Sequence, residues 1–306
     1  MTRILITGAS GLLGLNLAIE AAKHHEVFGV VNNHPVKTEA FKIMKADLLK
    51  PGTIESVFDE TQPDWVIHCA ALTNLDACDQ TPELAYRLNA DLPQKLATYV
   101  GRSGARMIHV STDAVFDGQR GDYSEEDAPN PINVYARTKF EGEQAVASVY
   151  PRAIIARVNM FGWSMTGKRS LSEFFFYNLQ KGQSVMGFTD VYFCPLLVND
   201  LADLFLQMLS KGLSGLYHVV SNECMTKYKF GVHIARKFGL DESLIQPVLV
   251  KNSSLTAARA PRLSLRVDKL INDLGQTPPK LIPSINKLYD LYLEGYPQKL
   301  MKMKAE

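Results

Sequence analysis

The sequence predicts a doubly wound α/β fold, in which helices cover both faces of a mostly parallel sheet. Short, continuously apolar runs alternate with helical patterns through the first half of the chain, as parallel strands joined by crossover helices require. The chain has 306 residues, of which 46% are hydrophobic. A chain of this length buries a large core without disulfides or metal ions.

The expected strands are apolar and β-branched, and they come in this order: Arg3–Thr7, Val27–Val31, Trp65–Cys69, Arg106–Ser111, Ala153–Val158 and Leu216–Val220. Helical patterns occupy Leu13–Lys23, Leu171–Lys181, Val198–Ser210, Lys227–Phe238 and Ile282–Glu294. The strand–helix rhythm weakens after Phe161. We therefore expect a nucleotide-binding part over 1–160, joined by the strand near 215–220, and a smaller interleaved lobe over 161–306. Gln298–Glu306 is expected to be a frayed polar tail.

Composition and charge exclude several classes of protein. The 33 Lys and Arg balance 32 Asp and Glu, which disfavours nucleic-acid or membrane binding through broad electrostatics. The cysteines Cys69, Cys78, Cys194 and Cys224 lack metal-site spacing and are expected to be free, reduced thiols. No leader or membrane span is apparent. We expect a cytoplasmic protein without a metal ion, and base rates favour a homodimer.

A glycine pattern directly follows the first predicted strand and opens onto a helix. In Gly8-x-x-Gly11-x-x-Gly14, the first glycine permits a tight turn, the second lets a pyrophosphate approach the backbone, and the third allows close helix packing. Backbone amides of the segment Gly8, Ser10, Gly11 and Leu12 would hold the phosphates together with the helix dipole. The alternative is a turn that binds nothing, but this context predicts a Rossmann-type dinucleotide site.

The residues after the second predicted strand bear on which cofactor binds. A carboxylate there would hydrogen-bond the ribose of NAD and repel the 2′-phosphate of NADP. The segment Asn32-Asn33-His34-Pro35-Val36-Lys37 has no acid and no arginine. NADP is therefore preferred, with Asn32, His34 or Lys37 as contacts, and NAD stays open.

Two residues have the spacing expected of a proton donor and its activating cation. Tyr135 and Lys139 lie on one face of a helix, where the ammonium could lower the tyrosine's pKa and bind the nicotinamide ribose. Tyr177 and Lys181 have the same spacing but lie in an aromatic run typical of a core. Tyr135 instead follows Thr112, at a strand end where α/β sheets bind ligands, so it is the predicted catalytic tyrosine.

The fourth predicted strand ends in Ser111-Thr112-Asp113. A hydroxyl at this position could hold a substrate's carbonyl oxygen or hydrogen-bond Tyr135. An ordinary strand-ending turn also favours these residue types.

Taken together, these motifs resemble those of the extended short-chain dehydrogenase/reductases, and within them the dTDP-4-dehydrorhamnose reductase family. The resemblance is strongest over the first 160 residues and is carried by Gly8/Gly11/Gly14, Asp47-Leu48, 70–79, 111–118, Tyr123, Glu125, Asp127, 130–135 and Lys139. It implies NADPH- or NADH-dependent reduction of the 4-keto group of a nucleotide-linked 6-deoxy sugar. The resemblance also implies that Tyr135 is the acid and that Lys139 activates it and binds the nicotinamide ribose. Thr112 would supply the hydroxyl that holds the substrate's carbonyl oxygen.

The resemblance also implies further contacts to the cofactor. Asp47 and Leu48 would meet the adenine, while Ala70, Ala71 and Leu72 would line the cofactor.

The sequence departs from the family where the substrate would be recognised. Met160 stands where a Trp is common, 193–197 replace a Gly-x-Pro-Thr segment, and Ala260 stands where an Arg precedes Pro261. Asp113 and Met160 are the expected substrate contacts. Asp113 is followed by Ala114, where similar dehydratases carry a Glu, and this favours simple reduction.

Several charged residues are weaker candidates. Those able to bind a diphosphate are Lys168, Arg169, Arg259, Arg262 and Arg266, although each also suits a solvated surface. His68 and His109 are expected to be neutral, hydrogen-bonded structural histidines.

Two other functions remain open. The regulatory beta subunit of methionine adenosyltransferase looks similar across the same motifs, and such a protein binds NADP without catalysis. A nucleotide-sugar epimerase would retain NAD. The complete set of Thr112, Tyr135 and Lys139 favours an enzyme, and the missing carboxylate after the second strand disfavours the epimerase.

Overall fold

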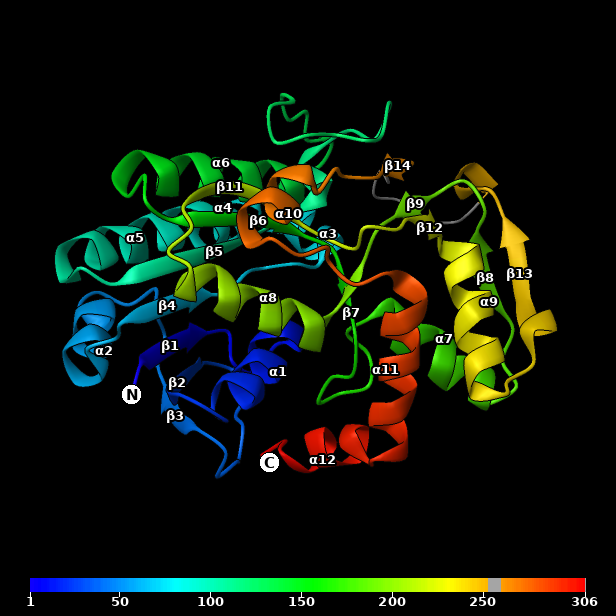
Figure 1. Ribbon diagram of the computed structural model, residues 1–306, viewed down its shortest axis with the longest axis horizontal. Helices are drawn as coiled ribbons and strands as arrows, with labels where there is room; N and C mark the ends of the chain where they lie inside the picture. The colour runs from blue at the N-terminus through cyan, green and yellow to red at the C-terminus, as the bar shows by residue number, and fades with distance from the viewer. Residues whose placement is uncertain (253–259, 306) are drawn as a thin grey trace.

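The α/β prediction is confirmed by a computed structural model that describes residues 1–252 and 260–305. Its central sheet has seven parallel strands in the order β11-β6-β5-β4-β1-β2-β3 (Figure 1). These strands are β1 (Arg3–Thr7), β2 (Glu26–Val31), β3 (Lys42–Lys45), β4 (Trp65–His68), β5 (Arg106–Thr112), β6 (Ile154–Val158) and β11 (Gly215–Val219). All their carboxyl ends therefore meet at one edge of the sheet, where ligands bind in this class of fold.

Helices cover both faces because alternate strand residues point in opposite directions. Ile4 and Ile6 of β1 join a core with residues of α1 (Leu12–Ala21) and α8 (Val198–Ser210). Leu5 joins a second core with residues of α2 (Thr53–Thr61), α5 (Leu92–Ser103) and α6 (Val134–Val149). The sheet is thus buried on both sides, which explains its nearly continuous apolar strands.

A smaller lobe lies beyond the carboxyl edge of the sheet, on the right of Figure 1. Its helices are α7 (Leu171–Gln180), α9 (Lys227–Phe238) and α11 (Leu281–Leu293); its strands are β7 (Met160–Phe161), β8 (Val185–Phe188), β9 (Tyr192–Phe193), β10 (Leu196–Leu197), β12 (Met225–Thr226), β13 (Ile245–Val248) and β14 (Arg262–Leu263). Helix α12 (Tyr296–Lys302) follows α11 and lies at the bottom of Figure 1. Trp163 is 1% exposed, contacts the rings of Phe176 and Phe238, and donates its indole N–H to the Leu288 carbonyl at 3.0 Å. These contacts unite the helices of the lobe.

Shorter segments complete the described chain. They are α3 (Leu75–Gln80), α4 (Pro82–Tyr86), the π-helical turn η1 (Arg87–Asp91), the 3-10 turns η2 (Asp113–Val115), η3 (Glu242–Leu244) and η4 (Val250–Asn252), and α10 (Asp268–Leu274). In the described residues, no helix combines the length and apolar character needed to cross a membrane.

The expectation of a frayed C-terminal tail is wrong. Tyr296–Lys302 forms α12, in which Leu300 is fully buried, and Met303 is 7% exposed. The tail is ordered because these apolar side chains join the core that contains α1.

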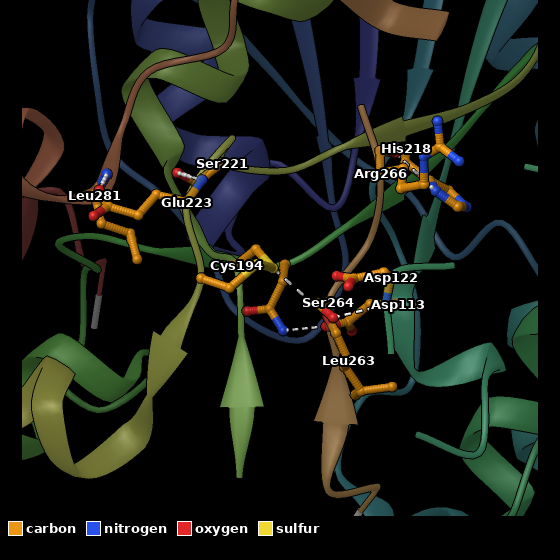
Figure 2. Close-up of a disulfide and its surroundings, with 12 residues drawn as sticks. Asp113, Asp122, Cys194, His218, Ser221, Glu223, Leu263, Ser264, Arg266 and Leu281 are labelled. Carbon is orange, nitrogen blue, oxygen red and sulfur yellow. Dashed lines mark hydrogen bonds between the residues drawn. A yellow bond between two sulfur atoms is a disulfide. The ribbon is translucent and has the colours of Figure 1, made fainter. Parts of the chain in front are cut away.

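The expectation of four free thiols is also wrong. Cys194 and Cys224 form a disulfide, with their Cα atoms 4.2 Å apart (Figure 2). Cys69 and Cys78 are free. The pair forms because antiparallel β9 and β12 set Phe193 opposite Met225, so Cys194, which follows Phe193, lies opposite Cys224, which precedes Met225. Since disulfides are rare in reducing compartments, cysteine usage no longer argues for the cytoplasm.

We predict that Gly14→Ala destabilises the fold. A Cβ at Gly14 would lie 2.3 Å from the Gly8 carbonyl oxygen, which is backbone and cannot easily move. The free energy of unfolding, measured with denaturant, should fall by about 2 kcal/mol. As a control, Gly101 in α5 has room for a methyl group, and Gly101→Ala should be neutral or stabilising by up to about 1 kcal/mol. Equal effects of the two variants would contradict the packing argument.

Candidate active site

The turn after β1 is built so that backbone can approach a ligand. Gly8 has a φ of +69°, and its carbonyl accepts the Gly11 N–H at 2.8 Å. A Cβ at Gly8 would lie 2.7 Å from the Ala70 backbone nitrogen. Within the described chain no side chain caps α1, whose N-cap residue is Gly11. A close backbone cradle at an uncapped helix N-terminus suits the pyrophosphate of a dinucleotide.

A buried asparagine joins the segment after β4 to helix α6. Asn89 in η1 accepts the Leu72 N–H at 2.9 Å and donates to the Leu72 carbonyl at 3.0 Å. It also donates to the Thr138 hydroxyl at 3.1 Å. Leu72, predicted to line the cofactor, is thereby tied to the helix of Tyr135 and Lys139. Asn89 was not predicted from the sequence, because the π-helical turn that holds it, a feature frequent at functional sites, is visible only in the structure.

Helix α6 carries Tyr135 and Lys139, as predicted. Asn133 caps the helix by accepting the Ala136 N–H at 2.8 Å. Lys139 is 3% exposed and donates to the Val110 carbonyl at 2.7 Å. Burial lowers its pKa to about 8, and the negative charge of Glu143 opposes this shift.

The expected lowering of the Tyr135 pKa by Lys139 is not what the structure gives. Burial raises the pKa of Tyr135 to about 12, and its hydrogen bond with Thr112 opposes the shift. Burial outweighs the neighbouring groups because it disfavours the charged phenolate. The hydrogen bond with Thr112 acts to lower this pKa.

Thr112 and Asp113 end β5 beside this tyrosine. The Thr112 hydroxyl accepts the Ala114 N–H and donates to the Asp113 carboxylate, both at 3.2 Å. Asp113 is 3% exposed and also accepts a bond from the Asn159 side chain at 2.6 Å. Burial raises the pKa of Asp113 to about 6, against the hydrogen bonds from Asn159 and Thr112.

Asp113 and Tyr135 line a cavity of about 240 Å³ at the carboxyl edge of the sheet, whereas Thr112 and Lys139 are not among its lining residues. Its lining comprises Leu75, Asp113, Ala114, Ile132, Asn133, Tyr135, Asn159, Val191, Tyr192, Phe193, Lys227, Ala260 and Leu263. Two positions where the sequence departs from the family pattern, Phe193 and Ala260, are among them. Asn159 and Lys227 were missed by the sequence analysis, whereas the expected contact Met160 does not line the cavity.

The remaining cofactor candidates lie apart from this cavity. Asn32 is exposed in the loop after β2, and Leu48 is 8% exposed. Asp47 accepts the Leu49 N–H at 3.1 Å and lines a second cavity, of about 580 Å³, between β3 and α2. Ala71 follows β4 beside Ala70, whose N–H bonds the Thr7 hydroxyl at 3.3 Å. Ser10 and Leu12 flank Gly11 in the turn.

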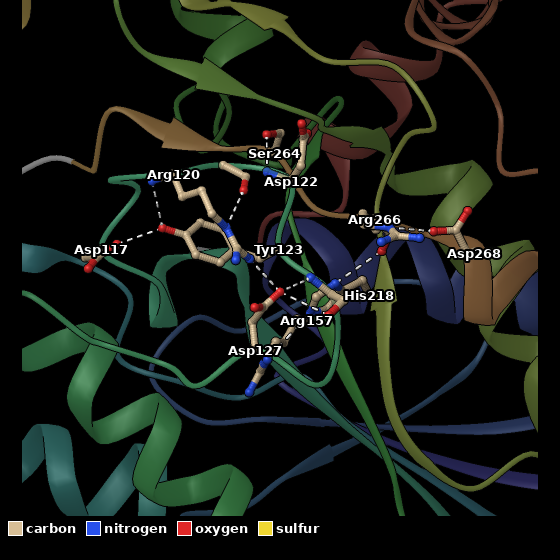
Figure 3. A network of polar contacts seen from close by, with 12 residues as sticks. Asp117, Arg120, Asp122, Tyr123, Asp127, Arg157, His218, Ser264, Arg266 and Asp268 are labelled. Carbon is tan, nitrogen blue, oxygen red and sulfur yellow. Dashed lines mark hydrogen bonds and ion pairs between the residues drawn. The ribbon is translucent and has the colours of Figure 1, made fainter.

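The diphosphate candidates are not gathered at the cavity. Arg266 pairs with Asp268 at 2.7 Å, in the polar network drawn in Figure 3. Arg262 is exposed on β14, and neither Lys168 nor Arg169 lines the cavity. Arg259 lies outside the described residues.

A buried ion pair joins α6, the helix of Tyr135 and Lys139, to β6. Glu143 and Arg157 have side chains 5% and 2% exposed and meet at 2.7 Å. Glu143 lies one helical turn after Lys139 and also accepts a bond from the Ser111 hydroxyl, next to Thr112. Glu143 was not predicted from the sequence, although Tyr135, Lys139 and Glu143 are spaced four residues apart and so share one face of the helix.

The two histidines are neutral, as expected, but only one is hydrogen-bonded. Burial lowers the pKa of His68 to about 3 and lowers that of His109 well below its usual value. His68 shares a hydrogen bond of 2.7 Å with Thr7. Neither ring nitrogen of His109 has a partner among the described residues.

Comparison with known proteins was made by sequence and by structure. Residues 1–293 match the model of the RmlD substrate binding domain family. A probable low-salt glycan biosynthesis reductase, Agl14 of Haloferax volcanii, is 33% identical, covering 90% of this chain and 93% of the relative. A dTDP-4-dehydrorhamnose reductase of Mycobacterium tuberculosis is 32% identical, covering 86% of this chain and 83% of the relative. The methionine adenosyltransferase 2 subunit beta of Bos taurus is 33% identical, covering 85% of this chain and 78% of the relative.

Solved structures with the same fold include two dTDP-4-dehydrorhamnose reductases. The one from Clostridium acetobutylicum has a TM-score of 0.82 and 26% identity, covering 95% of this chain and 100% of its own. The one from Bacillus anthracis, in complex with NADP, has a TM-score of 0.81 and 24% identity, covering 95% of this chain and 99% of its own.

We predict that Arg157→Met lowers the free energy of unfolding by about 3–5 kcal/mol, because it leaves the Glu143 carboxylate buried without its partner. The double variant Glu143→Gln/Arg157→Met should recover most of this loss in denaturant unfolding. The exposed Arg266–Asp268 pair serves as a control, since its side chains are 59% and 63% exposed. Arg266→Met should lower the free energy of unfolding by less than about 1 kcal/mol. An equally small decrease for Arg157→Met would contradict the prediction.

Proposed function

The chain belongs to the RmlD substrate-binding domain family, and from this premise we propose that it is an NADPH-dependent reductase of the 4-keto group of a nucleotide-linked deoxy sugar. The observation that carries the proposal is the cavity at the carboxyl end of β5. Tyr135 and Asp113 line it, and Thr112 hydrogen-bonds both side chains. A phenol and a hydroxyl at one site are what a carbonyl oxygen needs in order to become a hydroxyl group.

Cofactor binding is assigned to the amino-terminal half of the chain. The glycine turn Gly8–Leu12 would hold the pyrophosphate, 70–72 would line the cofactor, and Asp47 and Leu48 would meet the adenine. Lys139 would bind the nicotinamide ribose. The absence of an acid in 32–37 and the NADP complex of the Bacillus anthracis relative support NADP as the cofactor.

In the proposed reaction, Tyr135 donates its phenolic proton to the substrate's carbonyl oxygen. Its raised pKa keeps the phenol protonated before the transfer. Thr112 orients the phenol and the oxygen, and Lys139 stabilises the phenolate that remains. When bound, the reduced nicotinamide supplies the hydride that the carbonyl carbon accepts. The product is an alcohol, and Tyr135 regains its proton from solvent.

The residue after Asp113 bears on the type of reaction. Ala114 lines the cavity where a dehydratase would need a second acid to eliminate water. A methyl group cannot transfer a proton, which supports reduction without dehydration.

A second function is favoured by the relatives named methionine adenosyltransferase 2 subunit beta, one of which is 33% identical. In that case the chain would bind NADP and act as a regulatory subunit without turnover. The homodimer also remains a prediction.

The deciding experiment mixes purified protein and NADPH with dTDP-, UDP- and GDP-linked 4-keto sugars and follows the nicotinamide absorbance. Loss of absorbance with at least one sugar would support the reductase. NADPH binding without oxidation by any of the sugars would instead favour the regulatory function.

We predict that Tyr135→Phe lowers kcat at least about a hundredfold, because only the proton donor is lost. The NADPH dissociation constant, measured by fluorescence, should change less than about threefold. Tyr177→Phe is the matched control, since Tyr177 and Lys181 have the same spacing but lie away from the cavity. An active Tyr135→Phe enzyme would contradict the proposed mechanism.

We also predict a bell-shaped dependence of kcat/KM on pH. The Asp113 carboxyl becomes protonated below its pKa of about 6, which weakens its contact with Asn159. The Lys139 ammonium loses its charge above its pKa of about 8. Activity should fall on both sides. Asp113→Asn should remove the acidic limb, and an unchanged acidic limb in that variant would refute the assignment.

A further inference from the structure

The C-terminal segment lies outside the part of the chain that matches the family. The match ends at residue 293, whereas α12 and 303–305 continue the ordered chain. Tyr296 donates its hydroxyl proton to the Asn16 side chain in α1 at 2.8 Å, and Leu300 is fully buried. The segment is therefore anchored on the nucleotide-binding half of the molecule.

Beyond α12, the segment forms a short antiparallel ladder with the loop that follows β2. Lys37 donates its backbone N–H to the Met303 carbonyl at 2.7 Å, and Ala305 donates to the Pro35 carbonyl at 3.4 Å. Between them, Val36 and Lys304 form a bridge. In Figure 1 the red C-terminal end lies beside the blue loop between β2 and β3.

This loop is where a dinucleotide fold discriminates NADP from NAD. Without an arginine in 32–37, the loop itself offers only His34 and Lys37 as cationic side chains. Lys37 and Lys304 are both exposed, while Val36 between Pro35 and Lys37 is buried. Directly opposed residues of an antiparallel pair project to the same face, so Lys304 lies on the face of Val36 and Lys37 on the other. The ladder thus adds one lysine, Lys304, to the loop, and an ammonium group is a suitable partner for a phosphate.

We propose that Met303–Ala305 is part of the cofactor site: its backbone fixes the loop after β2, and Lys304 binds the 2′-phosphate of NADP. This inference rests on the proposed use of NADP. It explains how a chain without the usual arginine can select the phosphorylated cofactor. It also gives a function to a segment that the family match does not include.

A merely structural tail would give a different result. If the ladder only stabilised the fold, its loss would weaken NADPH and NADH binding by the same factor. A phosphate contact affects NADPH alone, because NADH has a hydroxyl at that position. The ratio of the two dissociation constants therefore separates the two roles.

The experiment measures dissociation constants for NADPH and NADH by cofactor fluorescence, and so does not depend on turnover. Lys304→Glu should raise the NADPH constant about tenfold, the factor that one charge-assisted hydrogen bond supplies, and leave the NADH constant unchanged. Lys299→Glu, on the exposed side of α12, is the matched control and should change neither. A chain that ends at Lys302 should lose at least as much NADPH affinity as Lys304→Glu.

Equal effects of Lys304→Glu and Lys299→Glu would overturn the inference, as would equal weakening of NADPH and NADH. The result is distinguishable from a failure of the proposed function. NADPH binding that depends on Lys304, without reduction of any sugar, would contradict the reductase and support this inference. If the unaltered chain bound no NADPH, both would fall.

Discussion

The arrangement of the site depends on how closely α6 packs against η1. A Cβ at Gly142 would lie 2.1 Å from the Asn89 carbonyl oxygen, so only a glycine fits there. This contact lays one face of α6 over β5 and lets Asn89 reach Thr138 and Leu72. Tyr135 and Lys139 lie on the same face of α6 as Gly142. The packing of Gly142 against the Asn89 backbone therefore positions the proposed acid and its cation. The buried Glu143 and Arg157 then join the same helix to β5 and β6.

Local patterns predicted the regular elements well. The segments Arg3–Thr7, Val198–Ser210 and Lys227–Phe238 begin and end as predicted, since each has a strong apolar period and clear ends. Strand β3 was not predicted, because Lys42 and Lys45 interrupt the apolar pattern of this four-residue edge strand. A frayed tail was also predicted where α12 forms. The burial of Leu300 depends on contacts far away in the chain, which no local pattern contains.

The site was predictable only where its signals were local. The glycine turn and the Tyr135–Lys139 spacing could be found in short stretches of sequence. In contrast, Asn159 and Lys227 reach the cavity from separate segments, which only the topology brings together. The direction of the Tyr135 pKa shift was wrong for the same reason, since spacing identifies a neighbour and does not reveal burial. The Cys194–Cys224 disulfide likewise arises from the pairing of β9 with β12.

The central claim is that this site transfers a hydride to a sugar carbonyl while Tyr135 supplies the proton. It is tested most directly with NADPH deuterated at the nicotinamide C4, on the face from which hydride leaves, and an accepted 4-keto sugar nucleotide. The account predicts that mass spectrometry finds one deuterium in the product, bound to the former carbonyl carbon. A sugar nucleotide that is converted without deuterium, or a label that stays entirely on the cofactor, would contradict it.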